Sequence, residues 1–263
     1  MKTPIVCSAL GAAVVLAALV ACGGGGGGAS PVPGSGTTPL PPSSQPTAAS
    51  ATPTPPVASG QTTQTSQGSV SGEPNMFTPN EGDTASGGQG SPVDGITCDP
   101  TMSNNYHIHV FLGVYVNGTQ MALPIAIGMQ NPGAASDGFI DTASCFYHIH
   151  THDSSGLVHV EDPNPNNIPI TGTMYTLQNV LDVWGITASA NNFGQFSGPV
   201  EVFTSGQVFR GDDANSGVVP ATDLTYWGSN PNTVPLYSHE YIVVEVGPTY
   251  PTSLPGVFFY IEN

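Results

Sequence analysis

Alternation of branched apolar side chains is the feature that most constrains how this chain folds. Residues 106–116 read Tyr-His-Ile-His-Val-Phe-Leu-Gly-Val-Tyr-Val, so isoleucine, leucine and valine return at every second position. A period of two is typical of a β-strand with one apolar face. Asn117-Gly118 then favours a type I′ hairpin turn, and residues 119–127 predict the return strand, with Pro124 favouring an edge or a bulge.

A second hairpin is predicted farther along the chain. Residues 144–152 form its first strand, Asp153-Ser-Ser-Gly156 its turn, and residues 157–161 its second strand. A four-residue turn sets three pairs opposite each other: His148 and Glu161, His150 and His159, and His152 and Leu157. A slip of one residue would bring valines onto that face instead, so the pairing depends on the turn.

The remaining periodicity predicts one helix and several strands. The helix has a capping Thr176, a terminal Gly185, and one apolar face made of Leu177, Val180, Leu181 and Trp184. High β-propensity marks residues 200–203, 207–210, 240–246 and 257–261. A hairpin between the first two of these would set Glu201 opposite Arg210. We therefore expect a mainly β domain over residues 96–263, an antiparallel sandwich or partly open barrel with one short packed helix.

The first 95 residues have a different composition. Residues 1–22 contain Lys2, an apolar run and the ending Leu19-Val-Ala-Cys22, which is the layout of an export signal. Residues 23–95 are rich in glycine, proline, serine and threonine and show no periodicity, which predicts a disordered tether.

The Leu-Val-Ala-Cys ending resembles the lipobox of bacterial lipoproteins. The resemblance implies that Cys22 becomes the lipidated N-terminus and anchors the protein in the bacterial cell envelope. Gly23 follows the cysteine, and the absence of aspartate there resembles lipoproteins of the outer membrane, facing the periplasm or the cell surface.

The charge balance excludes two classes of partner. The chain has two basic and eighteen acidic residues, a net charge of −16, and Arg210 is the only basic residue beyond the predicted leader. Binding to nucleic acid or to anionic lipid requires clustered lysine and arginine. We therefore expect no nucleic-acid partner and no contact with the membrane except through the lipid anchor.

Six of the seven histidines lie on the two predicted hairpins. Residues two apart on a strand point to the same side, so His148, His150 and His152 are expected to face one way. Neutral imidazole binds copper and zinc alike, and the pattern does not choose between them. The predicted ligands are His148, His150 and His159, with His107, His109 and His152 as further candidates and Glu161 or Asp153 as a fourth ligand or as an acceptor that fixes a tautomer.

Cys98 and Cys145 predict a disulfide, because both follow the leader of an exported chain. A bridge between them would bring the strand of His107 close to that of His148. The alternative is a blue-copper site, which needs a free thiolate and usually an axial methionine.

Two resemblances concern the histidines. Two histidines at i and i+2 with a third on a neighbouring strand are similar, in local geometry only, to the zinc site of α-class carbonic anhydrases. The cupin pattern fits poorly, because Glu161 lies eleven residues after His150. Segments 107–118, 147–161 and 176–185 together resemble a group of secreted bacterial domains of unestablished function, over residues 96–246. That likeness implies that these segments belong to a single domain, and it identifies no catalytic residues.

Three functions follow from this pattern. The first is a membrane-anchored copper- or zinc-binding protein whose affinity falls below about pH 6, where imidazole protonates. The second is an enzyme in which a vacant coordination position activates water, with Glu161 or Asp153 as general base. The third is a metal-free surface or adhesion module in which the histidines make structural hydrogen bonds. His239 is expected to be structural.

Overall fold

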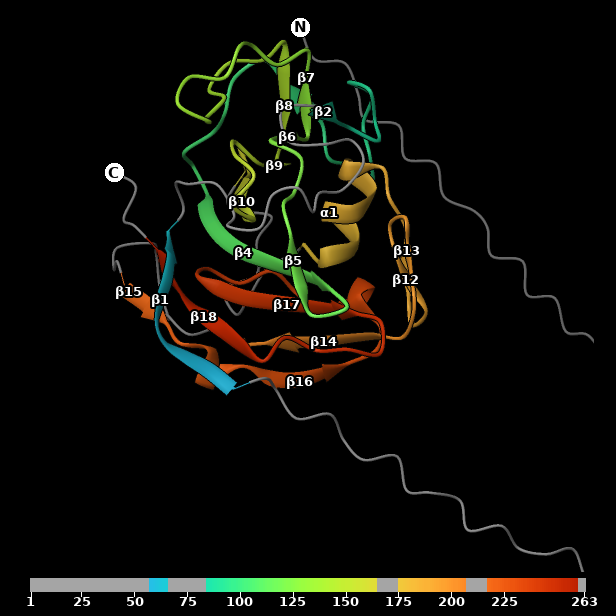
Figure 1. Cartoon of the computed structure of the whole chain (residues 1–263). Helices are drawn as coiled ribbons and strands as arrows, with labels where there is room; N and C mark the ends of the chain where they lie inside the picture. The colour runs from blue at the N-terminus through green and yellow to red at the C-terminus, as the bar shows by residue number, and fades with distance from the viewer. Residues whose placement is uncertain (1–56, 66–83, 165–174, 207–216, 260–263) are drawn as a thin grey trace, which may run out of the picture. The chain divides into compact units, whose positions relative to one another are not determined.

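The computed structural model describes residues 57–65, 84–164, 175–206 and 217–259, all of which belong to one compact unit, Ser50–Asn263. These residues form a mainly β structure with several sheets and one short α-helix, as the sequence predicts, and no barrel closes among them (Figure 1). The predicted leader and Cys22 lie outside the described residues. Within the described residues, no helix has the length and apolar character needed to cross a membrane.

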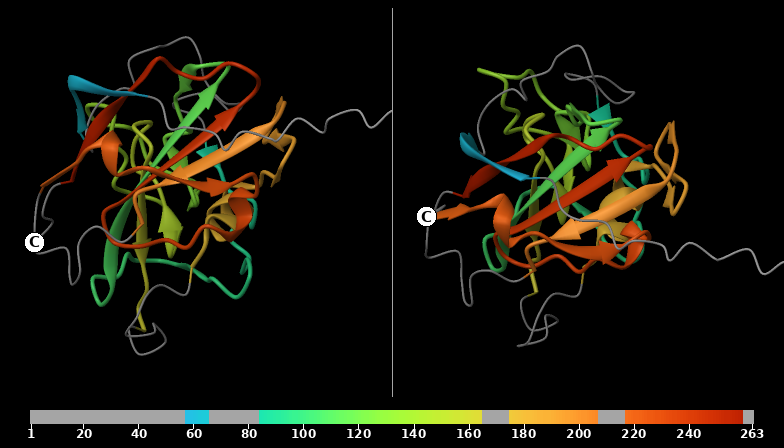
Figure 2. Two further views of the ribbon diagram at one scale, coloured as in Figure 1. Left: turned by 90° about the horizontal axis from the view of Figure 1, so that it is seen from below. Right: turned by 60° about the horizontal axis from the view of Figure 1, so that its bottom comes forward.

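The largest sheet carries most of the predicted strands. Its order is β16-β14-β17-β4-β10-β9, and β5 pairs with the end of β4 beyond β10. The bounds are β4 His107–Val116, β5 Thr119–Met121, β9 Ile149–His150, β10 Leu157–Glu161, β14 Val200–Thr204, β16 Thr225–Gly228 and β17 Glu240–Val246. Figure 2 shows β4 in green, β17 in red and β14 in orange lying side by side.

The centre of this sheet differs from the expected antiparallel pattern. β17 pairs with β4 in parallel, from Glu240 opposite Val110 to Val246 opposite Val116. A parallel neighbour requires a long crossover, and here the connection spans more than half of the domain. The sheet is therefore mixed. β5, β9 and β10 lie on one side of β4, and β14, β16 and β17 lie on the other.

Smaller sheets surround the large one. One has the order β1-β18-β15, with bounds Val57–Thr65, Ser253–Phe259 and Gly217–Val219. Another has the order β3-β8-β7, with bounds Cys98–Asp99, Cys145–Tyr147 and Met129–Gln130. The rest are the pair β2 Thr84–Ala85 and β6 Ala126–Ile127, the triple β11 Ala188–Ser189, β12 Asn192–Phe193 and β13 Phe196–Ser197, and the 3-10 turns Ala221–Asp223 and Pro231–Thr233.

The two faces of the large sheet bury separate cores. Even-numbered residues of β4, such as Val110 and Leu112, pack with the apolar face of helix α1, Leu177–Trp184. Odd-numbered residues, such as Phe111 and Tyr115, pack with β15 and β18. Each Å² of apolar surface that is removed from water stabilises the fold by roughly 25 cal/mol. Because successive side chains of a strand point to opposite faces, the alternation in the sequence places apolar residues in these cores.

Helix α1 has the predicted ends. The Asn179 side chain accepts a hydrogen bond of 2.9 Å from the backbone N–H of Thr176, and the N–H of Gly185 donates to the carbonyl of Leu181. Gly185 has φ 86°, the left-handed conformation that favours glycine at a helix end.

Two pieces of the predicted tether have regular structure. β1 pairs in parallel with β18. Residues 84–95 pack against the domain: the N–H of Gly87 donates to the carbonyl of Val183 at 2.6 Å, and the Tyr147 hydroxyl donates to the carbonyl of Ser91. The domain therefore begins before residue 96, and a glycine- and serine-rich segment gives no periodic signal of such packing.

β14 does not form the predicted hairpin between residues 200–203 and 207–210. β14 lies between β16 and β17, with Glu201 opposite Glu245. Arg210 lies outside the described residues.

Candidate metal centre

Three adjacent strands and the segment that follows β9 bring five histidines and one glutamate together. β10 lies between β9 and β4, so His150, His159 and His109 form one row across the sheet. In the next row Glu161 lies opposite His107. The predicted pairing of His150 with His159 is confirmed. The predicted pair of His152 and Leu157 does not form, because the pairing of β9 with β10 ends at His150 and residues 151–156 connect the two strands.

Two sets of side chains have the geometry of a metal site. The first is His150, His152, His159 and Glu161, all buried; the second is His107, His109 and His159. Within each set, the potential ligand atoms lie within 4.8 Å of one another. His159 belongs to both sets, so it is the one residue on which either arrangement depends.

The separations between ligand atoms match the edges of a coordination tetrahedron. Zinc–nitrogen bonds of about 2.0–2.1 Å place tetrahedral ligands roughly 3.3–3.4 Å apart. In the first set, the Nε2 of His150 lies 3.1 Å from the Nε2 of His152 and 3.5 Å from the Oε1 of Glu161. In the second set, the Nδ1 of His159 lies 3.1 Å from the Nε2 of His107 and 3.3 Å from the Nε2 of His109.

Backbone carbonyls determine the tautomers of two histidines. The Nδ1 of His150 lies 2.9 Å from the carbonyl oxygen of Tyr147, and the Nδ1 of His152 contacts the carbonyl oxygen of Ile140. A carbonyl only accepts, so each Nδ1 carries the proton and each neutral ring presents an unprotonated Nε2. The two Nε2 lone pairs thus face each other at 3.1 Å. A cation between or beside them removes this repulsion.

Burial keeps these rings neutral. Desolvation, with His152 as the next contribution, lowers the pKa of His150 to about 3. Desolvation and then the neighbouring His109 lower the pKa of His159 well below its usual value. Metals bind the neutral form of imidazole, so at neutral pH these ligands need not lose a proton.

Glu161 is held with one oxygen directed into the cluster. Its Oε2 accepts a hydrogen bond of 3.0 Å from the backbone N–H of Ser103. Its Oε1 lies 3.5 Å from the Nε2 of both His107 and His150 and 3.8 Å from the Nδ1 of His159. The described residues contain neither of the chain's two basic residues, so no lysine or arginine among them balances this buried carboxylate.

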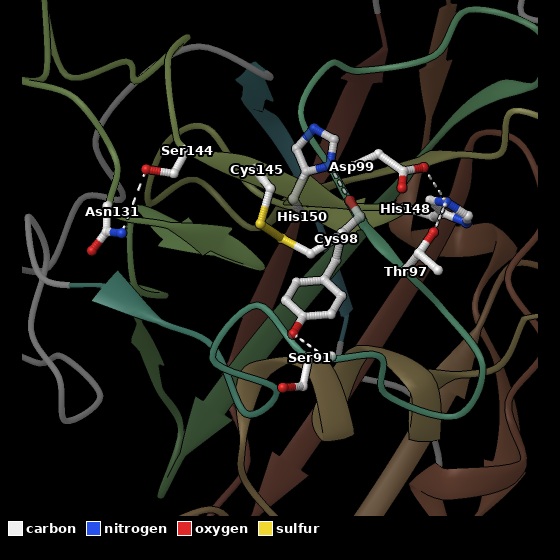
Figure 3. The surroundings of a disulfide bond; sticks show 10 residues. Ser91, Thr97, Cys98, Asp99, Asn131, Ser144, Cys145, His148 and His150 are labelled. Atoms are coloured by element: carbon white, nitrogen blue, oxygen red, sulfur yellow. Dashed lines mark hydrogen bonds and ion pairs between the residues drawn. A yellow bond between two sulfur atoms is a disulfide. The ribbon is translucent and has the colours of Figure 1, made fainter.

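His148 does not join its predicted partners. The chain bends at this residue, because β8 belongs to the sheet with β3 and β7 whereas β9 pairs with β10. The alternation of side chains is lost at the bend. The His148 ring lies 3.0 Å from Asp99 and 3.3 Å from the hydroxyl of Tyr175, away from His150 (Figure 3).

Other predicted residues take structural positions. Asp153 accepts hydrogen bonds from the N–H and hydroxyl of Ser155, so it stabilises the turn and belongs to neither ligand set. The Cys98–Cys145 disulfide is present and joins β3 to β8 (Figure 3). Both thiols are thus consumed, which excludes the blue-copper alternative. The His239 ring packs against Phe259, and the backbone N–H of His239 donates to the carbonyl of His109.

Three groups that support the cluster were not predicted: the carbonyls of Tyr147 and Ile140 and the N–H of Ser103. All are backbone atoms, which no residue type in the sequence identifies. Comparison with protein-family models, curated proteins and solved structures finds no match to this chain.

Proposed function

We propose that this protein binds a copper or zinc ion through His150, His152, His159 and Glu161, at a domain anchored to the bacterial envelope by lipidated Cys22. The facing Nε2 atoms of His150 and His152 carry the proposal, because two acceptors at 3.1 Å in a buried site favour a bound cation. Three imidazoles and one carboxylate suit either metal.

The surroundings support a tight site. All four ligands are buried, and backbone groups already orient His150, His152 and Glu161. Such outer partners typically change metal affinity by roughly 10–100-fold. The lipid anchor rests on the lipobox resemblance, and it would present the site on the extracytoplasmic side of the membrane.

Elemental analysis tests this proposal. The purified full chain is stripped with a chelator, dialysed, offered copper or zinc in separate samples, and freed of unbound metal. We expect at least one ion of one of these metals to stay with each chain. Retention of neither metal would contradict the proposal and favour the metal-free adhesion module.

A second candidate function is metal-dependent hydrolysis. It is favoured by the set His107, His109 and His159, because three protein ligands leave a fourth position for water and the His107 side chain is 19% exposed. Glu161 lies 3.5 Å from the Nε2 of His107 and is suited to accept a proton from that water.

An activated ester assayed with the zinc-loaded chain tests this candidate. Hydrolysis should rise with pH around neutrality and disappear on chelation. His107→Ala should abolish it while zinc remains in the first set. An equal rate for the variant and the unchanged protein would rule the candidate out.

A further inference from the structure

A second buried polar cluster lies on the same face of the large sheet, toward the other end of β4. Glu201 on β14, Glu245 on β17 and Tyr115 on β4 form one row across three neighbouring strands. Directly opposed residues on antiparallel strands have Cβ atoms about 4.5–5.5 Å apart. The two carboxylates are therefore direct neighbours.

A fourth polar side chain reaches this row over Gly113. A Cβ atom at Gly113 would lie 3.3 Å from the Cε2 atom of Tyr115 and 3.6 Å from that of Tyr241. The two tyrosine rings thus both lie over the glycine, where the missing side chain leaves room for them. Tyr241 is fully buried, so its hydroxyl lies inside the protein.

Two carboxylate oxygens in this cluster lack hydrogen-bond partners. The hydroxyls of Tyr115 and Tyr241 interact with each other. Among the described residues, no group makes a hydrogen bond with the Oε2 of Glu201 or the Oε1 of Glu245. Glu245 is only 2% exposed. Buried polar atoms are almost always satisfied, so two neighbouring unpartnered carboxylate oxygens indicate a ligand.

The charge of the cluster gives the sign of that ligand. Glu201 and Glu245 are like charges placed side by side, and the described part of the chain contains no lysine or arginine. Burial, and then the nearby Glu201, raise the pKa of the Glu245 carboxyl to about 8. Such a site attracts a positive charge from solution.

We propose that this cluster binds a hard divalent cation of the calcium class, with Glu201 and Glu245 as the charged ligands. Oxygen atoms alone are offered here, and calcium prefers oxygen, whereas the imidazole nitrogens of the first site suit copper or zinc. The hydroxyls of Tyr115 and Tyr241 line the same site. The cluster shares no residue with the histidine centre.

Terbium luminescence tests the site, because terbium replaces calcium and emits when a nearby tyrosine is excited. The full chain is titrated with terbium and then with calcium. We expect saturable, tyrosine-sensitised emission that calcium displaces. Glu245→Gln and Glu201→Gln should each weaken binding at least tenfold. Asp137→Asn, which removes the same charge from an exposed loop, should leave it unchanged.

Two further variants define the result. Tyr115→Phe should lower the sensitised emission more than it lowers calcium affinity measured by calorimetry. His159→Ala should bind calcium as the unchanged chain does, which separates this site from the histidine centre. If Glu245→Gln does not fold, the half-buried Glu201→Gln gives the answer. Equal calcium affinity in Glu201→Gln and Asp137→Asn, or no calcium binding at all, would overturn the proposal.

Discussion

The Nε2 atoms of His150 and His152 face each other at 3.1 Å while both Nδ1 atoms contact backbone carbonyls. This relationship favours the proposed metal site over a structural hydrogen-bond network. In such a network one ring would donate to the other, but the carbonyls already hold the proton of each neutral ring. The arrangement is stable when a cation receives the lone pairs, and the predictions below follow from it.

Loss of His159 should weaken the binding of copper or zinc strongly, because His159 belongs to both ligand sets. We expect His159→Ala to lower the affinity for the metal by at least about 100-fold. Residues that only hydrogen-bond to a metal ligand already change this affinity by about 10–100-fold. The matched control is His148→Ala, which removes an imidazole outside both sets. Competition with a chromophoric chelator measures both affinities. Similar losses in the two variants would contradict the assignment.

Acid should destabilise the metal-free protein. The pKa of His150 is lowered to about 3 by burial, so between pH 6.5 and 3 the unfolded chain binds a proton that the native chain does not. Stability therefore falls as pH falls, by about 1.4 kcal/mol per pH unit for each such histidine. Urea denaturation at pH 6.5 and 4.5 in the presence of a chelator measures this. His150→Gln should show a smaller loss, and an unchanged loss would contradict the prediction.

Glu240 should make the protein less stable as the pH rises, which is opposite to the effect of His150. Burial raises its pKa to about 7, although hydrogen bonds from Thr204 and the backbone of Tyr237 oppose the shift. The native state then holds a proton that the unfolded chain releases, so stability falls as pH rises from about 4.5 through 7. Glu240→Gln should raise the free energy of unfolding at pH 8 by roughly 1–2 kcal/mol and change it little at pH 5. Equal effects at both pH values would exclude this explanation.

Gly156 should be intolerant of a side chain. It ends the turn between His152 and His159 with φ 102°, and a Cβ atom would lie 2.5 Å from the carbonyl oxygen of Leu112. Gly156→Ala should lower the free energy of unfolding by about 2 kcal/mol or more and weaken metal binding. Gly138→Ala is the control, because φ is also positive there but nothing lies within 4 Å. The same melting temperature in both variants would refute the contact argument.

Local geometry could be predicted from the sequence, and long-range geometry could not. The pairing of His150 with His159 follows from counting residues in a turn, and the face shared by His107 and His109 follows from alternation. That β10 pairs with β4, and β17 with β4 in parallel, depends on packing between distant segments. All five histidines of the cluster could thus be predicted from the sequence, but their division into two ligand sets could not.

The error at His148 has a specific cause. Alternation holds only while a strand stays in one sheet, and the chain passes from β8 to β9 at this residue. The disulfide and Asp99 fix β8 in its own sheet, on the far side of the bend from His150. Short strands of two or three residues carry too little pattern to reveal such a change.

Crystals of the zinc-loaded protein, measured on both sides of the zinc absorption edge, test the central claim most directly. We predict an anomalous peak among His150, His152, His159 and Glu161, within about 2.0–2.2 Å of one atom of each. A peak only at His148 or on the protein surface, or no peak in a sample loaded with excess zinc, would contradict the metal centre.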